Sequence, residues 1–143
     1  MSDAKELSRR IFNEVWNHKN VAAIDELMAA NYVHHDPQSP KFSDGIEGYK
    51  QLVAYYFNAF PDAQFTIDQE IQEGDNAVTR WRVNGTHKGD LPTLPATGQT
   101  FSVAGITIAR SKNGKLVESW NNWDALGLMQ QLGGVSVVTD RAA

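Results

Sequence analysis

The hydrophobic period of this sequence changes near Pro61, and that change constrains the fold more than any other feature. Before it, Leu7, Ile11 and Val15 recur every four positions, as on an amphipathic helix. After it, apolar and polar residues alternate, which predicts strands. Helices first and strands second predict an α+β domain in which the helices cover one face of a strongly curved antiparallel sheet.

Four helices and five strands are expected. The predicted helices span 3–17, 21–30, 44–60 and 124–132, and Asp44 with Glu47 has the spacing of a capping box. A short strand is expected at 32–35 and long strands at 65–71, 77–87, 101–109 and 116–123. Asn113-Gly114 is typical of a tight hairpin, so the last two strands are expected to pair antiparallel. Residues 88–99 are rich in proline and glycine and are expected to form a loop at the rim of a cavity.

Composition narrows the possible partners. The chain has 143 residues, of which 41% are hydrophobic. Residues 1–143 are therefore expected to form a single domain with a hydrophobic core. The formal net charge of −4 argues against nucleic acid. No apolar run approaches the roughly 18 residues of a membrane helix, so no membrane partner is expected. The absence of Cys excludes disulfides and thiol catalysis and fits a cytoplasmic protein.

Four short motifs occur in a fixed order along the chain. They are Gly85-Thr86-His87-Lys88-Gly89, Pro95-Ala96-Thr97-Gly98, Asn113-Gly114-Lys115-Leu116-Val117-Glu118 and Gln130-Gln131-Leu132-Gly133. Together with the order of elements, they resemble the SnoaL-like polyketide cyclases, or ester cyclases, of the nuclear transport factor two and ketosteroid isomerase superfamily. The resemblance implies a cone-shaped α+β barrel and an intramolecular aldol ring closure without metal or cofactor. It also implies a catalytic Asp and an assisting His, and these positions hold Asn121 and Thr107 in this sequence.

The candidate catalytic residues are His35, Asp124 and Asn121. His34 and His35 are neighbours in a predicted strand, so they should point to opposite faces, and Asp36 follows where it could orient an imidazole. One His could be a base oriented by the carboxylate; alternatively, one His is solvated and the other is a hydrogen-bonded wall residue. Asp124 could be a displaced acid or the N-cap of the following helix. Asn121 can donate a hydrogen bond to an oxygen but cannot exchange a proton near neutral pH. No third ligand accompanies the His pair, so no metal site is expected.

Aromatic residues are expected to line a pocket for a flat hydrophobic ligand. The substrate-binding candidates are Trp16, Tyr32, Tyr56, Phe57, Trp81, His87, Thr107 and Trp123. His87 could reach the pocket rim or fix the adjacent loop. Trp120 should lie on the other face of the sheet, where Arg80, Arg82 and Ile108 could join it in a homodimer surface.

Three functions fit these residues. The first is a cofactor-independent enzyme of the cyclase or isomerase type that acts on a hydrophobic carbonyl compound. The second is a non-catalytic module that binds a small apolar ligand. The third is an epoxide hydrolase, which by resemblance would need an Asp-Arg-Asp set around a water molecule. Alternation with Trp81 places Arg80 and Arg82 outside the pocket, which disfavours the third function.

Overall fold

The computed structural model describes residues 3–42 and 44–135 and confirms the α+β expectation. Its helices are α1 (Ala4–Arg10), the π-helix η1 (Ile11–Asn17), α2 (Ala23–Leu27), the short 3₁₀-helix η2 (Pro40–Phe42), α3 (Gly45–Ala59) and α4 (Ala125–Leu132). Its strands are β1 (Met28–His35), β2 (Gln64–Glu73), β3 (Asn76–Thr86), β4 (Thr100–Lys112) and β5 (Lys115–Trp123).

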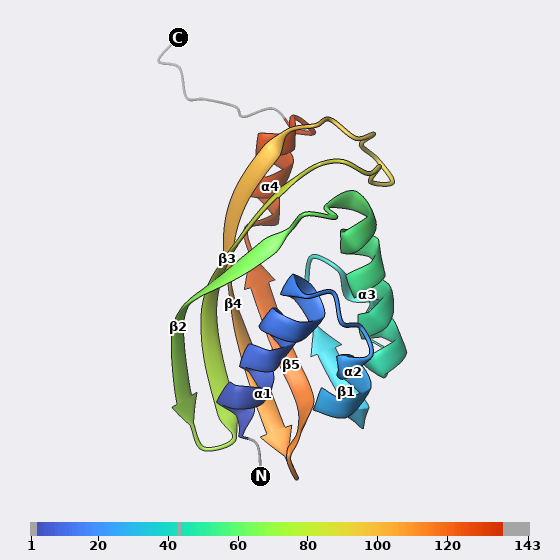
Figure 1. Cartoon of the computed structure of the whole chain (residues 1–143). Helices are drawn as coiled ribbons and strands as arrows, with labels where there is room; N and C mark the ends of the chain where they lie inside the picture. Colours follow the sequence, from blue (N-terminus) through green and yellow to red (C-terminus); the bar gives the residue numbers. More distant parts are fainter. Residues whose placement is uncertain (1–2, 43, 136–143) are drawn as a thin grey trace.

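The five strands form one open sheet in the order β1-β5-β4-β3-β2. Strands β2 to β5 pair antiparallel, but β1 runs parallel to β5. The sheet is therefore mixed rather than wholly antiparallel, because the chain leaves β1, passes through α3 and three strands, and returns beside it. Figure 1 shows the long strands bending around α1 and α3, which cover one face. We call this helix-covered side the inner face.

Local turn and cap signals place the element ends. Asn113 and Gly114 both have positive φ, at 54° and 78°, as a two-residue hairpin turn requires, so the predicted β4–β5 hairpin is confirmed. Asp124 caps α4, and Gly133 ends it with φ 82°. Asp44 stands at the N-cap of α3, but its side chain makes no capping hydrogen bond, so the predicted capping box does not form.

The first two helices differ from their predicted bounds. The expected helix over 3–17 is divided into α1 and the wider η1, a form that is frequent at functional sites. The second helix ends at Leu27 because Met28 is already extended, so β1 begins four residues before the predicted strand. Both differences arise at apolar segments whose periodicity suits more than one structure.

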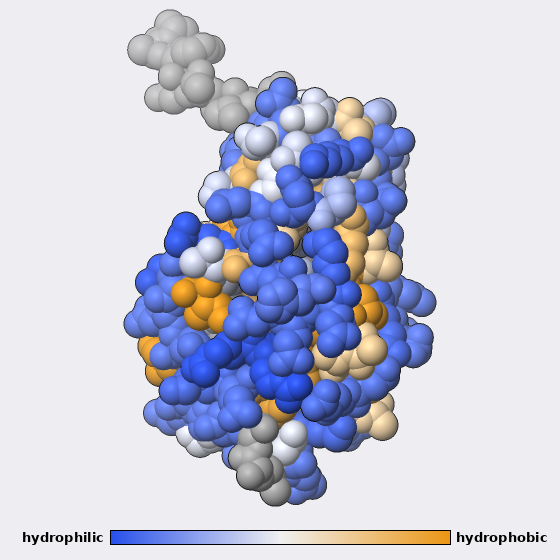
Figure 2. Space-filling model, viewed as in Figure 1, coloured by the Kyte–Doolittle hydropathy of each residue, from blue (hydrophilic) through white to orange (hydrophobic). Residues whose placement is uncertain are grey.

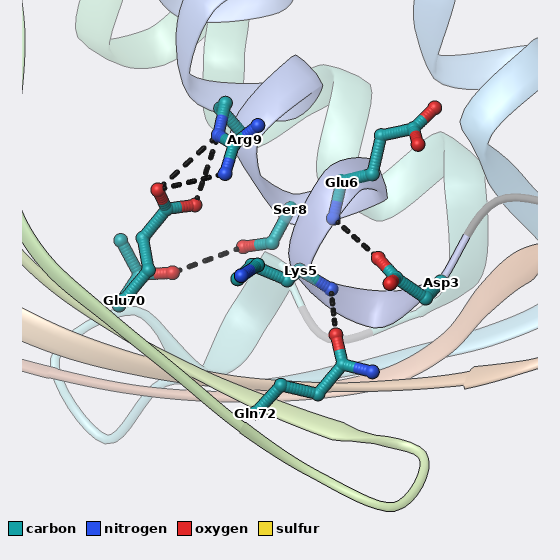
Figure 3. A network of polar contacts seen from close by, with 8 residues as sticks. Asp3, Lys5, Glu6, Ser8, Arg9, Glu70 and Gln72 are labelled. Carbon is teal, nitrogen blue, oxygen red and sulfur yellow. Dashed lines mark hydrogen bonds and ion pairs between the residues drawn. The ribbon is translucent and has the colours of Figure 1, made fainter.

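Helix α1 is held to the edge strand β2 and to β3 by polar contacts. The Arg9 guanidinium donates to both carboxylate oxygens of Glu70 at 3.0 to 3.2 Å, and the backbone N–H of Lys5 donates to Gln72 at 3.0 Å (Figure 3). The Ser8 hydroxyl lies 3.4 Å from that of Thr79. These contacts hold the N-terminal helix over the inner face.

The core lies between the helices and the inner face and is rich in aromatic side chains. Figure 2 shows that the surface on the viewed side is mostly hydrophilic, with separate hydrophobic patches. The aromatic side chains of this core are buried or partly buried. None of the helices in the described ranges is long and apolar enough to cross a membrane.

Candidate functional site

An apolar cavity of about 100 Å³ lies between the helices and the inner face of the sheet. Residues from α1, η1, β1, α3, the four long strands and α4 contribute to its walls. All six aromatic residues named from the sequence line it: Trp16, Tyr32, Tyr56, Phe57, Trp81 and Trp123. Thr107 and Asn121 line it as well. Eight residues named from the sequence therefore lie at the cavity wall, and alternation along the strands explains why those on β1, β3, β4 and β5 face inward.

Polar side chains cross the inner face in one row. Thr79 pairs with Thr107, and Thr107 pairs with Asn121 on the next strand. Asp36 continues the row, since it follows His35, which pairs with Trp120 beside Asn121. We call Thr79, Thr107, Asn121 and Asp36 the inner row. Thr107, Asn121 and Asp36 line the cavity, whereas Thr79 is buried against Ser8 of α1.

Two tryptophans orient the inner row. Trp81 on β3 and Trp123 on β5 lie two residues along their strands from this row, and both pair with Gly105 of β4. Trp81 Nε1 donates to Thr107 Oγ1 at 2.9 Å, and Thr107 Oγ1 donates to Asn121 Oδ1 at 2.6 Å. Because an indole N–H only donates, the threonine proton must point to the Asn121 carbonyl. The amide nitrogen of Asn121 is thereby turned toward Asp36.

Asp36 is a buried carboxylate, 5% exposed, that receives three hydrogen bonds. Asn121 Nδ2 and Trp123 Nε1 each donate to Asp36 Oδ2 at 3.2 Å, and the backbone N–H of Gln38 donates to Oδ1 at 2.9 Å. Donors of this kind suit a charged carboxylate. Among the described residues that line the cavity, Asp36 is the one carboxylate, and none is Lys or Arg.

His34 lines the same cavity beside Asp36. Burial lowers the pKa of His34 from 6.5 to about 4, against the opposing influence of the Asp36 charge, so the imidazole is neutral near pH 7. Its Nδ1 lies 3.1 Å from the Tyr32 hydroxyl. Its Nε2 has no hydrogen-bond partner among the described residues. The cavity thus holds a neutral imidazole as well as a carboxylate.

The structure does not bring His35 to the cavity, and this corrects the candidate catalytic set. His35 is on the outer face, where its Nε2 lies 2.7 Å from Glu118 Oε2 and its ring stacks on Trp120 at 5.4 Å. Strand alternation explains the placement, since His34 takes the inward position. The prediction that the two His point to opposite faces is confirmed.

Asp124 and His87 also lie outside the cavity wall. Asp124 Oδ1 accepts from the backbone N–H of Gly127 at 2.8 Å, so Asp124 is the N-cap of α4 rather than a displaced acid. His87 is fully buried, and its Nδ1 accepts from the backbone N–H of Thr97 at 3.3 Å. His87 is not among the cavity residues. Its contact with Thr97 instead holds the loop over 88–99 in place.

Sequence reasoning missed Asp36 as a cavity residue, although the signal was present. Asp36 lies two positions beyond His34 and four beyond Tyr32, so a strand extended by one residue turns all three inward. Pro37 suggested that the loop began earlier. Arg80 and Arg82 lie on the outer face beside Asp68, as expected, and Arg82 pairs with it at 2.8 Å. The cavity wall described here therefore lacks the arginine of an Asp-Arg-Asp set.

Comparison with known proteins agrees with this architecture. A curated relative, the aklanonic acid methyl ester cyclase DnrD of Streptomyces peucetius, is 28% identical over 93% of this chain and 92% of its own. The crystal structure of a candidate polyketide cyclase from Acidithiobacillus ferrooxidans is 35% identical, with a TM-score of 0.82 over 94% of this chain and 97% of that one. AclR of Streptomyces galilaeus, a candidate hydroxylase, is 25% identical, with a TM-score of 0.81 over 93% of this chain and 86% of its own.

The chain matches the sequence model of one protein family along almost the whole domain. The sequence model of the SnoaL-like polyketide cyclases covers residues 6–132, from α1 to the end of α4. The matched range includes every residue of the inner row. This chain belongs to the SnoaL-like polyketide cyclase family.

Proposed function

We propose that this protein moves a proton at the carbon next to a carbonyl group of a hydrophobic compound, as the first step of an intramolecular aldol ring closure. Asp36 is the general base and acid. The observation that carries the proposal is a buried carboxylate, held by three donors, at the wall of an aromatic cavity. Such a group can take a proton from carbon once a neighbouring carbonyl accepts the electron pair.

The residues around Asp36 support this role. Asn121 uses one amide proton on Asp36 and keeps a second that can bind a substrate oxygen. Position 121, where the family resemblance implies an acid, is therefore hydrogen-bonded to the acid that we propose. The cavity wall described here carries no cationic side chain, which favours an uncharged ketone or ester over a free carboxylate.

The proposed reaction balances without a cofactor. Asp36 removes the proton, and the electrons of the C–H bond form an enolate whose charge rests on the carbonyl oxygen. The enolate carbon then attacks a second carbonyl of the same molecule, which forms the new C–C bond and an alkoxide. Protonated Asp36 returns its proton to that alkoxide, and the enzyme is restored.

The first step can be tested without the natural substrate. The cavity of about 100 Å³ suits a compact probe, so we choose 1-indanone and follow exchange of its α-protons in deuterated buffer by NMR. The protein is expected to accelerate exchange over buffer, and Asp36→Asn should reduce the acceleration by about 10²-fold or more. Asp68→Asn, a carboxylate of the outer face, should retain the wild-type rate. Buffer-level exchange by the wild type, or full exchange by Asp36→Asn, would contradict the proposal.

A non-catalytic binding protein is the second candidate. It is favoured by Thr107 and Asn121, which stand where the resemblance implies a His and an Asp and which cannot exchange protons near neutral pH. This reading predicts that 1-indanone binds to the wild type and to Asp36→Asn without accelerated exchange in either. Chemical-shift titration alongside the exchange experiment separates the two functions.

A further inference from the structure

Tyr49 presents a hydroxyl group in the cavity that the proposed function does not yet use. It projects from α3 toward the inner face, is 5% exposed, and lines the cavity. Trp16 Nε1 donates to its hydroxyl oxygen at 2.9 Å. Because the indole can only donate, the phenol must keep its own proton for another partner.

The other two tyrosines of the cavity have acceptors. The Tyr32 hydroxyl lies 3.1 Å from His34 Nδ1 and also interacts with Ser119. The Tyr56 hydroxyl lies 3.1 Å from Ser39 Oγ. For Tyr49, no residue in the described part of the chain accepts the hydroxyl proton. A buried donor in this state is costly unless a ligand or water accepts from it.

The ring of Tyr49 is held on three sides. It packs edge-on against His34 at 5.2 Å, against Tyr32 at 5.8 Å and against Trp16 at 6.3 Å between ring centroids. These contacts and the Trp16 hydrogen bond leave the hydroxyl little freedom. Burial raises the pKa of Tyr49, and the nearby Asp36 charge raises it further, so the group remains a proton donor across the physiological range.

We propose that Tyr49 is a catalytic residue whose O–H group binds the substrate carbonyl oxygen and stabilises the enolate. Trp16 is then a positioning residue, because its indole occupies the phenol oxygen and directs the proton into the cavity. During the step, Asp36 takes the proton from carbon while the C–H electrons move to the oxygen held by Tyr49. The phenol keeps its proton throughout. This inference rests on the proposed function and names the group that receives the developing charge.

The test compares Tyr49→Phe with Tyr55→Phe, the same change on a tyrosine of α3 that is not among the cavity residues. Exchange of 1-indanone α-protons should fall by about 10²-fold in kcat in Tyr49→Phe, as for the loss of one oxyanion donor. Tyr55→Phe should match the wild type. Exchange by Tyr49→Phe within about twofold of wild type would overturn the inference while leaving the role of Asp36 standing.

A binding measurement separates this inference from the proposed function. In NMR titrations, the wild type should bind 1-indanone more tightly than indane, its analogue without the oxygen, and Tyr49→Phe should lose that preference. A purely structural role would weaken both ligands equally, which would contradict the inference even if no exchange were seen. Should Tyr49→Phe fail to fold, Trp16→Phe provides the second test, because it frees the hydroxyl to turn away and should also reduce the preference. An unchanged preference in Trp16→Phe would count against the positioning role.

Discussion

The two faces of the sheet differ in polarity at neighbouring positions of the same strands. The inner row, Thr79, Thr107, Asn121 and Asp36, is polar and lies under the helices. The row beside it on the outer face is largely apolar and consists of Ile71, Val78, Ile108, Trp120 and His35. Buried polar groups and exposed apolar ones are the informative departures from ordinary burial. The inner row is where we propose chemistry, and the outer row is where we propose contact with a second copy of the chain.

The adjacent histidines show this contrast most simply. His34 is 4% exposed, neutral and surrounded by aromatic rings, whereas His35 lies at the surface beside Glu118 and Trp120. The same side chain thus meets two environments because the strand turns it to one face or the other. Residue type alone therefore could not assign either role.

The largest expected effect concerns the outer row and the mass of the protein. Ile71 and Ile108 are 52% and 38% exposed, and we propose that two copies of the chain associate through this face. Light scattering should then give twice 15.9 kDa, and Ile108→Asp should halve that mass. Leu126→Asp, on α4, should leave it unchanged. A wild-type mass of 15.9 kDa would refute the proposed dimer.

His34 should make stability depend on pH. Its pKa is about 4 in the folded chain and near 6.5 when unfolded, so between these values only the unfolded state takes up the proton. Above pH 6.5, His34 is neutral in both states and does not change the free energy of unfolding. As the pH falls from 6.5 toward 4, protonation of the unfolded state lowers the free energy of unfolding by up to about 3 kcal/mol. Urea unfolding across this range should show a shallower decline in His34→Gln. The exposed His18→Gln variant should follow the wild type, and an equal decline in His34→Gln would contradict the prediction.

Gly105 should not tolerate a larger side chain. An added Cβ would lie 2.7 Å from Trp123 Cβ and closer still to the Trp81 ring. Gly105→Ala is expected to cost about 2 kcal/mol of unfolding free energy, since the indoles must shift. Tryptophan fluorescence should change with it. Ala104→Ser on the outer face provides the matched control, and equal stability of the two variants would show that the inner face is not tightly packed there.

The smallest effect is expected for the Arg82–Asp68 ion pair of the outer face. Its two hydrogen bonds, at 2.8 and 2.9 Å, lie at the surface and are screened by salt. Asp68→Asn should lower the unfolding midpoint slightly at low salt, and the difference should disappear at high salt. A large loss of stability that persists at high salt would contradict this prediction and would show that polar contacts of the outer face also matter for stability.

The parts of the fold that follow from local patterns could be predicted. Alternation in β3 placed Trp81 inward and Arg82 outward, and Asn113-Gly114 predicted the hairpin. The parallel pairing of β1 with β5 could not be predicted, because it joins distant segments. Nor could the division of the first helix at Ile11, since an apolar stripe fits an α-helix and a π-helix nearly equally.

Part of the cavity wall could be predicted from the sequence, but the carboxylate within it could not. The aromatic lining follows from residue type and alternation, whereas the choice between Asp36 and Asp124 depends on partners far along the chain. Asp124 finds its partner three residues away at the start of α4. Asp36 accepts one local hydrogen bond from the N–H of Gln38, but its two side-chain donors, Asn121 and Trp123, reach it from β5. Contacts between residues so far apart cannot be predicted from their spacing in the sequence.

The pairing of β1 with β5 also sets the order in which the site can assemble. Asp36 and Trp123 are 87 positions apart, so their contact is among the most distant in the chain. Contacts of high sequence separation form slowly, because much chain entropy must be lost first. During synthesis, Asp36 and the N–H of Gln38 leave the ribosome together, well before the side-chain donors Asn121 and Trp123 of β5. The environment of Asp36 in the cavity is therefore complete only once β5, the last strand in the described part of the chain, has paired with β1.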